Sequence, residues 1–202
     1  MGEFLPPEIR EIPSSLLAIL RGCPEVQELE QLPHDESYST SSEFRDVHIL
    51  KKKERNHSSS GALPVERAQE IRIPWKQVST SLKKSLAAFI GCDIRSLTSI
   101  SFMVFLRESG IGSHCDQPWV GDSFWGFSFA LESAVSSAES YKLLFRTKGK
   151  TGRVVFELDV ERNTAYHCSG DNRYYFEHEV PRSSTVGRRF FMRVGLNRFL
   201  EP

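Results

Sequence analysis

The feature that most constrains the fold is a succession of short β-like segments in residues 98–196 of this 202-residue chain. The segments are rich in β-branched and aromatic residues, and turn residues such as Gly, Asn, Ser and Pro separate them. The expected strands are Thr98–Leu106, Phe124–Leu131, Tyr141–Arg146, Arg153–Leu158, Thr164–Cys168, Tyr174–Val180 and Arg188–Leu196. Such a series after helices predicts an α+β, mainly-β fold with a jelly-roll core of two sheets.

Two segments ahead of these strands have helical patterns. In Ser14–Arg21 a serine cap precedes an apolar run, and Gly22 with Pro24 ends it. A second helix is expected from Lys76 to about Ile90, before Gly91, because apolar residues recur on one helical face. These residues are Val78, Leu82, Leu86, Phe89 and Ile90. We expect the helices to buttress the β core.

The chain is expected to form one structural domain in two parts. Residues 1–74 are an N-terminal extension with a short helix and a flexible polar loop, and residues 75–202 are the jelly-roll core. Within the extension, residues 33–62 are polar and rich in turn residues, apart from Phe44–Leu50, which has a short strand pattern. The composition of residues 33–62 fits either a linker or a lid over a substrate.

The composition is that of a soluble globular protein, with 39% hydrophobic and 11% aromatic residues. No apolar run approaches the roughly 20 residues of a membrane span, and the N-terminus lacks the features of a secretory signal. The four cysteines include no Cys-x-x-Cys pair. We therefore expect an intracellular protein, in the nucleus or cytoplasm, that does not bind membranes and is a monomer.

The net charge of zero is unevenly distributed. From Tyr141 onward there are 12 basic and 7 acidic residues, whereas residues 1–140 carry 14 basic and 19 acidic ones. The second part therefore has a net charge of +5, which permits an anionic cosubstrate or a nucleic acid, DNA or RNA, as partner. Solvated strand faces and loops explain the same excess of basic residues equally well.

A His-x-Asp motif, His114 and Asp116, lies in a glycine-containing turn before the strands that follow it. Strand alternation places His114 and Asp116 on one face, and it places His178 on the face that Tyr174 shares. Two imidazoles and one carboxylate with open coordination positions form the facial triad of non-haem Fe(II) oxygenases. The sequence therefore predicts a metal site of His114, Asp116 and His178. His167 is a competing third ligand, and Zn²⁺ is a competing metal.

The last expected strand places Arg193 among bulky apolar residues, on one face with Arg189, Phe191 and Gly195. A guanidinium in such surroundings requires an anionic partner or a route to water. Gly195 removes a side chain from the same face and leaves room beside Arg193. Arg193 can therefore offer a bidentate fork to a carboxylate anchored beside the metal.

These residues together resemble the Fe(II)/2-oxoglutarate-dependent dioxygenases, most closely their AlkB-like branch and next the TET/JBP-type base oxygenases. The resemblance covers roughly residues 75–199, and the segments that carry it are Phe102–Phe105, Ser109–Asp116, Ser169–His178 and Arg188–Arg198. AlkB-like enzymes usually carry two arginines six residues apart on the last strand, whereas here Phe199 stands six residues after Arg193. Arg189 is therefore the candidate for the second cation.

The resemblance implies a double-stranded β-helix that binds Fe(II) and 2-oxoglutarate and uses dioxygen. His114, Asp116 and His178 would hold the iron, and Arg193 with Arg189 would bind the cosubstrate. The implied reaction oxidises a methylated base in nucleic acid, by demethylation or hydroxylation. Two alternatives stay open: a 2-oxoglutarate-dependent hydroxylase of a small molecule or protein side chain, and a non-catalytic jelly-roll binding module.

Two residues are candidates for substrate binding. Trp119 follows the metal motif in an expected loop, and enzymes that act on extruded bases stack them on aromatic side chains. Arg173 precedes the strand of His178 and could contact phosphates, although a solvated arginine is the default interpretation. Phe124 and Trp125 fit the core of the sandwich better than a stacking platform.

Overall fold

A computed structural model of the chain describes residues 3–24, 26–27, 38–43, 69–72, 78–105, 111–115, 122–129, 140–149, 152–181 and 189–197. Within this part of the chain, the helices are α1 (Ser14–Arg21), α3 (Thr80–Ile90), α4 (Gly170–Tyr175) and the 3₁₀ helix η2 (Ile94–Ser96). The strands are β1 (Glu8–Glu11), β2 (Tyr38–Glu43), β3 (Gln69–Arg72), β4 (Leu97–Phe105), β5 (Ile111–His114), β6 (Ser123–Phe129), β7 (Ser140–Thr147), β8 (Val154–Glu161), β9 (Thr164–Cys168), β10 (Phe176–Val180) and β11 (Arg189–Leu196).

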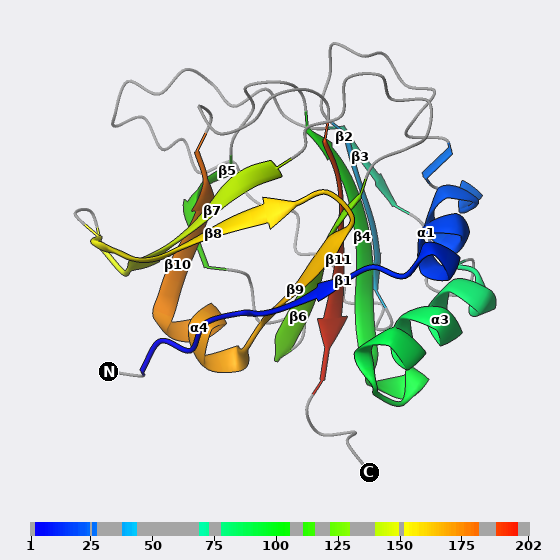
Figure 1. Cartoon of the computed structure of the whole chain (residues 1–202), viewed down its shortest axis with the longest axis horizontal. Helices are drawn as coiled ribbons and strands as arrows, with labels where there is room; N and C mark the ends of the chain where they lie inside the picture. Colours follow the sequence, from blue (N-terminus) through cyan, green and yellow to red (C-terminus); the bar gives the residue numbers. More distant parts are fainter. Residues whose placement is uncertain are drawn as a thin grey trace.

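The described strands form two sheets, and all their pairs are antiparallel except that of β2 with β3. Sheet A has seven strands in the order β1-β9-β6-β11-β4-β2-β3, and sheet B has four in the order β5-β10-β7-β8. Sheet B covers one side of sheet A, while α1 and α3 lie beyond the other side (Figure 1). This arrangement confirms the expected α+β, mainly-β class.

The first hydrophobic core lies between sheet A and the helices. Its buried members include Leu16, Leu20, Leu82, Leu86, Phe102, Trp125, Phe127, Met192 and Val194. The expected serine cap of α1 is wrong, because Pro13 occupies the N-cap and α1 begins at Ser14 without a side-chain cap. In α3, Ser79 accepts a hydrogen bond from the Leu82 amide, and Gly91 ends the helix with a φ of 82°, which favours glycine.

The second hydrophobic core lies between the two sheets. Its buried members include Phe124, Tyr141, Leu143, Phe145, Leu158, Tyr166, Val180 and Phe191. Strand β11 contributes to both cores, since Phe190 and Met192 belong to the helix-side core and Phe191 to the inter-sheet core. The period-two alternation predicted for this strand is therefore present, and it directs Arg193 toward sheet B.

The N-terminal part adds strands to the outside of sheet A. β1 pairs with β9, and β2 pairs with β4. β2 lies in a segment that we expected to be a polar loop, so this strand was not predicted. The strand expected at Phe44–Leu50 lies outside the described residues. The division at residue 74 stays a prediction.

One expected strand begins later than its pattern suggested. Tyr174 was expected in the strand of His178, but it belongs to α4, and β10 begins at Phe176. Ser169 caps α4 by accepting a hydrogen bond from the Asn172 amide, so the residues expected to form a turn start a helix instead. The alternation from Phe176 to Val180 is as predicted, with residues 176, 178 and 180 buried.

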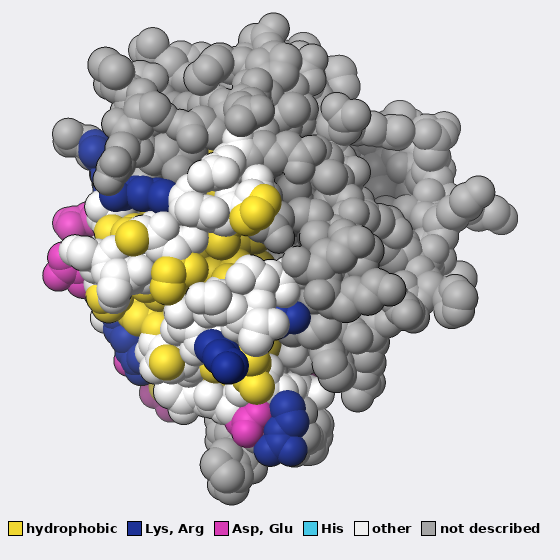
Figure 2. Space-filling view, turned by 90° about the vertical axis from the view of Figure 1, so that its right-hand side faces the viewer, with side chains coloured by type: hydrophobic (Ala, Val, Ile, Leu, Met, Phe, Trp, Pro, Cys, Tyr) yellow, Lys and Arg dark blue, Asp and Glu magenta, His cyan; other side chains and the backbone are white. Residues whose placement is uncertain are grey.

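The outer face that carries α1 and α3 has a mixed surface. Figure 2 shows hydrophobic side chains there in patches, interspersed with basic, acidic and other polar groups. Among the described residues, no helix is long and apolar enough to cross a membrane.

Candidate metal and cosubstrate site

Two of the predicted metal ligands, His114 and His178, lie directly opposite each other. β5 and β10 are neighbours in sheet B, and His114 and His178 are partners in their register. Their ring centroids are 4.3 Å apart with an angle of 52° between the rings. His178 is 8% exposed. Residues separated by 64 positions in the chain thus form a pair of imidazoles at one edge of the inter-sheet space.

The tautomer of His114 suits a metal ligand. Its Nδ1 lies 2.7 Å from the Gly112 carbonyl oxygen, which can only accept a hydrogen bond. Nδ1 must therefore carry the proton, and in the neutral ring the lone pair is then on Nε2. Metal-binding histidines usually donate their second N–H in this way, which fixes the ring orientation and makes the ligand more basic.

His178 lies in an apolar environment. The ring centroid of Phe124 is 5.9 Å from that of His178, and the ring centroid of Phe145 is 6.3 Å from it. The Nδ1 atom of His178 is shielded from solvent. An apolar shell around a metal-binding histidine limits the access of solvent to the site.

The third predicted ligand, Asp116, lies outside the described residues, as does Trp119. Of Arg189 the structure describes the backbone in β11 but not the side chain. Within the described residues, no group of three His, Cys, Asp or Glu side chains is close enough to hold a metal ion. The histidine pair, with the Gly112 carbonyl bound to His114, fits a metal site that a third ligand from the following residues would complete.

Arg193 lies in the middle of sheet A and faces sheet B. It is partly buried, and its Nε is shielded from solvent. Its register partners are Ser101 on β4 and Gly126 on β6. Directly opposed residues in antiparallel strands share a face, so Ser101 lies on the same side of the sheet as Arg193.

Tyr166 extends this row across a fourth strand. It is the register partner of Gly126 on β9, and its ring covers Gly126 so closely that an added Cβ would lie 2.8 Å from the phenol oxygen and 2.5 Å from Cζ. The row therefore consists of a phenol, a glycine, a guanidinium and a buried hydroxyl: Tyr166, Gly126, Arg193 and Ser101. Three hydrogen-bond donors on one inner face suit a carboxylate.

Phe124 connects this row to the histidine pair. It contacts His178 across the space between the sheets and pairs with Gly195 on β11. Gly195 lies two residues from Arg193 on the same face, and Ser99, its partner on β4, is also a small residue. The face between Arg193 and the histidines is therefore lined by glycine, serine and one aromatic ring rather than by bulky aliphatic side chains.

His167, the competing third ligand, lies on the other face of sheet A. Its ring stacks on that of Trp125 with centroids 5.3 Å apart. Trp125 belongs to the helix-side core, whereas Tyr166, the neighbour of His167 on β9, belongs to the inter-sheet core. His167 therefore does not face the space in which His114 and His178 meet. Phe124 and Trp125 are both core aromatics, as expected.

The expectation that Arg173 is a solvated arginine is wrong. Its exposure is 0%, and it lies in the last turn of α4 with Cζ 5.4 Å from the centroid of the Tyr174 ring. In this conformation a phosphate from solution cannot reach the Arg173 side chain, because that side chain has no accessible surface. The structure therefore gives no support to a substrate contact at Arg173. The helical turn of α4, which sequence alternation did not reveal, places Arg173 inside the protein.

Sequence reasoning did not identify Tyr166 and Ser101 as site residues. Each stands in a β-rich segment where an aromatic or a small polar residue is unremarkable. The available signal was Gly126, because a glycine within a strand often marks a close approach of another group. Which group approaches Gly126 depends on the strands that pair with β6, and the sequence alone does not specify those strands.

Comparison with known proteins gives structural likeness alone. Neither a protein-family model nor a curated protein sequence matches the chain. Similar solved structures include a 2OG-Fe(II) oxygenase family oxidoreductase from Burkholderia pseudomallei, at 15% identity and a TM-score of 0.35 over 57% of this chain and 50% of that one. YcfD, a ribosomal oxygenase from Escherichia coli, has 12% identity and a TM-score of 0.37 over 57% of this chain and 28% of its own.

A third solved structure, OsALKBH1, has 14% identity and a TM-score of 0.37 over 66% of this chain and 71% of its own. The chain thus spans half the length of the Burkholderia protein and about a quarter of YcfD. TM-scores of this size do not decide a function, so the function below is argued from the chain's own residues.

Proposed function

We propose that this chain is an Fe(II)/2-oxoglutarate-dependent dioxygenase. The observation that carries the proposal is the histidine pair, in which His114 and His178 face each other and the Gly112 carbonyl holds the His114 tautomer suited to a metal. Asp116 is proposed as the third ligand, since it stands two residues after His114. Two histidines and a carboxylate leave the open positions that an oxygenase requires.

The strand order supports a double-stranded β-helix as the framework. The eight strands from β4 to β11 divide into β9-β6-β11-β4 in sheet A and β5-β10-β7-β8 in sheet B. Eight antiparallel strands shared between two facing sheets are typical of the jelly roll. On this framework the histidines belong to sheet B and Arg193 belongs to sheet A, so the site lies between the sheets.

The row on sheet A is proposed to bind the distal carboxylate of 2-oxoglutarate. Arg193 would offer two N–H donors, and the hydroxyls of Tyr166 and Ser101 stand on either side of it in the register. Arg189 remains the proposed second cation. The small residues between Arg193 and His178 would leave room for the rest of the cosubstrate.

Iron with bound 2-oxoglutarate would use dioxygen to decarboxylate the cosubstrate to succinate and to hydroxylate a C–H bond of the substrate. In that reaction His114 and His178 would serve as neutral nitrogen donors, and Gly112 would keep the His114 ring in place. Phe124 and Phe145 would limit the access of water to the histidines. Arg193 would fix the orientation of the cosubstrate without changing its own protonation state.

A methylated base in DNA or RNA is the proposed substrate. The net charge of +5 from Tyr141 onward permits a polyanionic partner. Trp119 remains the proposed stacking residue, while the burial of Arg173 removes the support for a phosphate contact at that position. Oxidation of an N-methyl group would release formaldehyde, whereas a C-methyl group would become hydroxymethyl. A monomer in the nucleus or cytoplasm remains our expectation.

Turnover of 2-oxoglutarate tests the enzyme class. Purified protein with Fe(II) and dioxygen should convert 2-oxoglutarate to succinate, and His114→Ala and Asp116→Ala should abolish this conversion. Protein that holds one iron per chain and forms no succinate would exclude both the nucleic-acid oxygenase and the small-molecule or protein hydroxylase. Full activity in either variant would refute the proposed iron ligands.

A panel of methylated oligonucleotides tests the substrate class. DNA and RNA oligonucleotides with single N-methyl or C-methyl bases should give formaldehyde or an oxidised base above the level of unmethylated controls. Succinate formation without any change in the oligonucleotides would instead favour a small-molecule or protein substrate.

A further inference from the structure

The strand that carries His114 is short and lies at the edge of sheet B. β5 has four residues, and among the described strands its only partner is β10. Its register shows two residue pairs, His114 with His178 and Ile111 with Val180, with an irregularity between them. β5 thus takes three residue steps where β10 takes two, which is the pattern of a bulge. Because β5 is short, bulged and at an edge, its backbone pairing with β10 fixes the position of His114 less firmly than a longer, regular pairing would.

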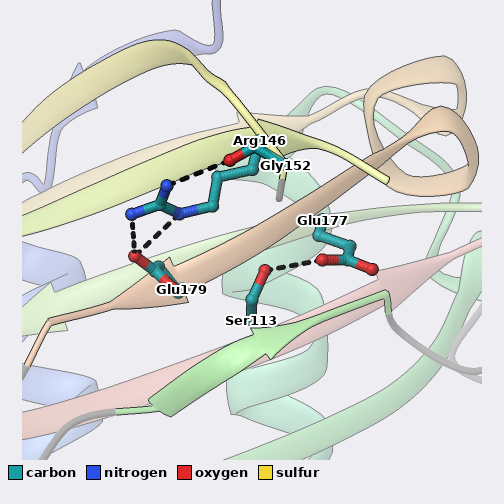
Figure 3. A network of polar contacts seen from close by, with 5 residues as sticks. All are labelled: Ser113, Arg146, Gly152, Glu177 and Glu179. Atoms are coloured by element: carbon teal, nitrogen blue, oxygen red, sulfur yellow. Dashed lines mark hydrogen bonds and ion pairs between the residues drawn. The ribbon is translucent and has the colours of Figure 1, made fainter. Parts of the chain in front are cut away.

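A side-chain contact on the outer face of sheet B ties β5 to β10. The Ser113 hydroxyl donates a hydrogen bond of 2.8 Å to Oε2 of Glu177 (Figure 3). Ser113 directly precedes His114, and Glu177 directly precedes His178. The contact therefore joins the two strands immediately behind the histidine pair, on the face opposite to the imidazoles.

The other outward carboxylate of β10 is bound to the strand on the opposite side. Oε1 of Glu179 accepts hydrogen bonds from Nε and Nη2 of Arg146 at 2.9 and 2.6 Å, and Nη1 of Arg146 donates to the Gly152 carbonyl at 3.2 Å. Glu177 and Glu179 flank His178 in the sequence, and each connects β10 to a different neighbour (Figure 3). Of these two carboxylates, Glu177 is the one that contacts the strand of His114; beyond the end of that strand, the Cys115 thiol also donates to the Phe176 carbonyl at 3.3 Å.

We propose that Ser113 and Glu177 are positioning residues that fix the spacing of His114 and His178 for the metal. This inference rests on the proposed iron site. Both side chains lie on the face opposite to the imidazoles, so neither would bind the metal itself. Their hydrogen bond holds β5 against β10 across the bulge and so keeps the two imidazoles at a fixed spacing. Loss of the bond should lower metal affinity because the free protein then samples other spacings of the two imidazoles.

The four variants that test this role separate the hydrogen bond from the charge. Ser113→Ala removes the bond and keeps the carboxylate, while Glu177→Gln removes the charge and keeps an acceptor for the hydroxyl. Glu177→Ala removes both. Glu179→Ala is the matched control, because it removes the carboxylate on the other side of His178 and disturbs only the contact to β7.

The measurement is the dissociation constant of Co(II), followed by its visible absorption, for the full chain and each variant. Ser113→Ala and Glu177→Ala should weaken Co(II) binding by about threefold to tenfold, the effect of one solvent-accessible hydrogen bond. Their absorption bands should also shift relative to wild type. Glu177→Gln and Glu179→Ala should bind within about twofold of wild type, although Glu179→Ala should lower the melting temperature.

Three results would overturn the proposal, in two distinct ways. Equal Co(II) affinity for wild type and Ser113→Ala, or equal losses for Glu177→Gln and Glu177→Ala, would show that the hydrogen bond does not position the ligands. A wild-type protein that binds no Co(II) would refute the metal site and the positioning role together. Because Ser113→Ala is a small change on an exposed residue, it provides the decisive comparison even if Glu177→Ala does not fold.

Discussion

Two glycines near the site differ in what their missing side chain allows. Gly112 stands in the glycine-containing turn that the sequence suggested before His114, yet an added Cβ there would meet no described atom within 4 Å. Gly126 stands in a strand, and an added Cβ would lie 2.5 to 2.8 Å from the ring of Tyr166. The contribution of Gly112 is its carbonyl, which accepts from His114, whereas Gly126 is required because it has no side chain.

We therefore predict that Gly126→Ala destabilises the protein and Gly112→Ala does not. In Gly126→Ala the ring of Tyr166 must move, which should lower the free energy of unfolding by about 1–3 kcal/mol. The same shift should weaken 2-oxoglutarate binding, because the phenol leaves the row beside Arg193. Urea unfolding and titration with 2-oxoglutarate in the presence of Mn(II) measure the two effects. Wild-type values for Gly126→Ala would mean that Tyr166 accommodates the methyl group without leaving the site.

Residue identity alone could predict part of the site. The alternation of β10 and β11 placed His178 and Arg193 toward the inter-sheet space, and both lie on that side. The burial of Arg173 was not foreseen, because the residues before β10 were expected to form an ordinary turn and instead form the helical turn α4. Charge and spacing do not reveal such a turn when the capping residue, Ser169, also fits an ordinary loop.

At the scale of elements, the N-terminal segment is fixed to α4 by one buried amide. Asn172 is 1% exposed, accepts from the Leu5 amide at 3.1 Å and donates to the Leu5 carbonyl. This contact brings the ring of Phe4 against three aromatic rings of the inner face of sheet B: Phe145, Phe156 and Phe176. The segment thus packs beside the strand of His178, since Phe145 also contacts His178.

We predict that Asn172→Ala releases this segment. Loss of two hydrogen bonds from a buried side chain should lower the free energy of unfolding by about 1–3 kcal/mol. The Leu5 amide should exchange with deuterium faster, because its acceptor is gone. Leu5→Ala is the matched control, since the Leu5 side chain is 51% exposed and its backbone bonds do not depend on it. Unchanged protection of the Leu5 amide in Asn172→Ala would show that packing of Phe4 alone holds the segment.

The bounds of individual helices and strands were more predictable than the pairing between strands. The bounds of α1 match the apolar run with its following glycine, and β9 begins and ends where its pattern does. β2 was not predicted, because Tyr38–Glu43 is polar throughout and forms a strand by pairing with β4. A strand whose main stabilisation is a backbone ladder to a distant segment has no local sequence signal.

At the scale of the whole molecule, the order of strands in each sheet lies beyond sequence patterns. The mainly-β class follows from local alternation, but the assignment of β5 and β10 to one sheet and of β11 to the other depends on pairs far apart in the chain. The candidate site depends on this assignment, since sheet B supplies the histidines and sheet A supplies the arginine. The order of the motifs could therefore suggest the candidate ligands. Only the structure could show that the two histidines lie opposite each other.

A site shared between two sheets should couple ligand binding to the stability of the whole domain. A ligand that binds only the folded protein stabilises it by about 2.7 kcal/mol at a concentration of 100 times its dissociation constant. For a domain of this size, each kcal/mol raises the melting temperature by about 2–4 °C. We therefore predict that Mn(II) with 2-oxoglutarate raises the melting temperature by about 5–10 °C, in the absence of turnover.

Variants on the two sheets should separate the rise in melting temperature into a contribution from Mn(II) and one from 2-oxoglutarate. His178→Ala should remove the response to Mn(II), because one of the two proposed histidine ligands is gone. Arg193→Lys should keep the response to Mn(II) and lose most of the further rise with 2-oxoglutarate, since a lysine cannot form the bidentate contact to the carboxylate. If 2-oxoglutarate stabilised Arg193→Lys as much as wild type, the cosubstrate would have to bind elsewhere. A response to Mn(II) that survived in His178→Ala would place the metal at other residues. A single site between the sheets therefore requires two different outcomes. The melting temperature of His178→Ala should not respond to Mn(II), whereas that of Arg193→Lys should respond to Mn(II) but hardly to 2-oxoglutarate.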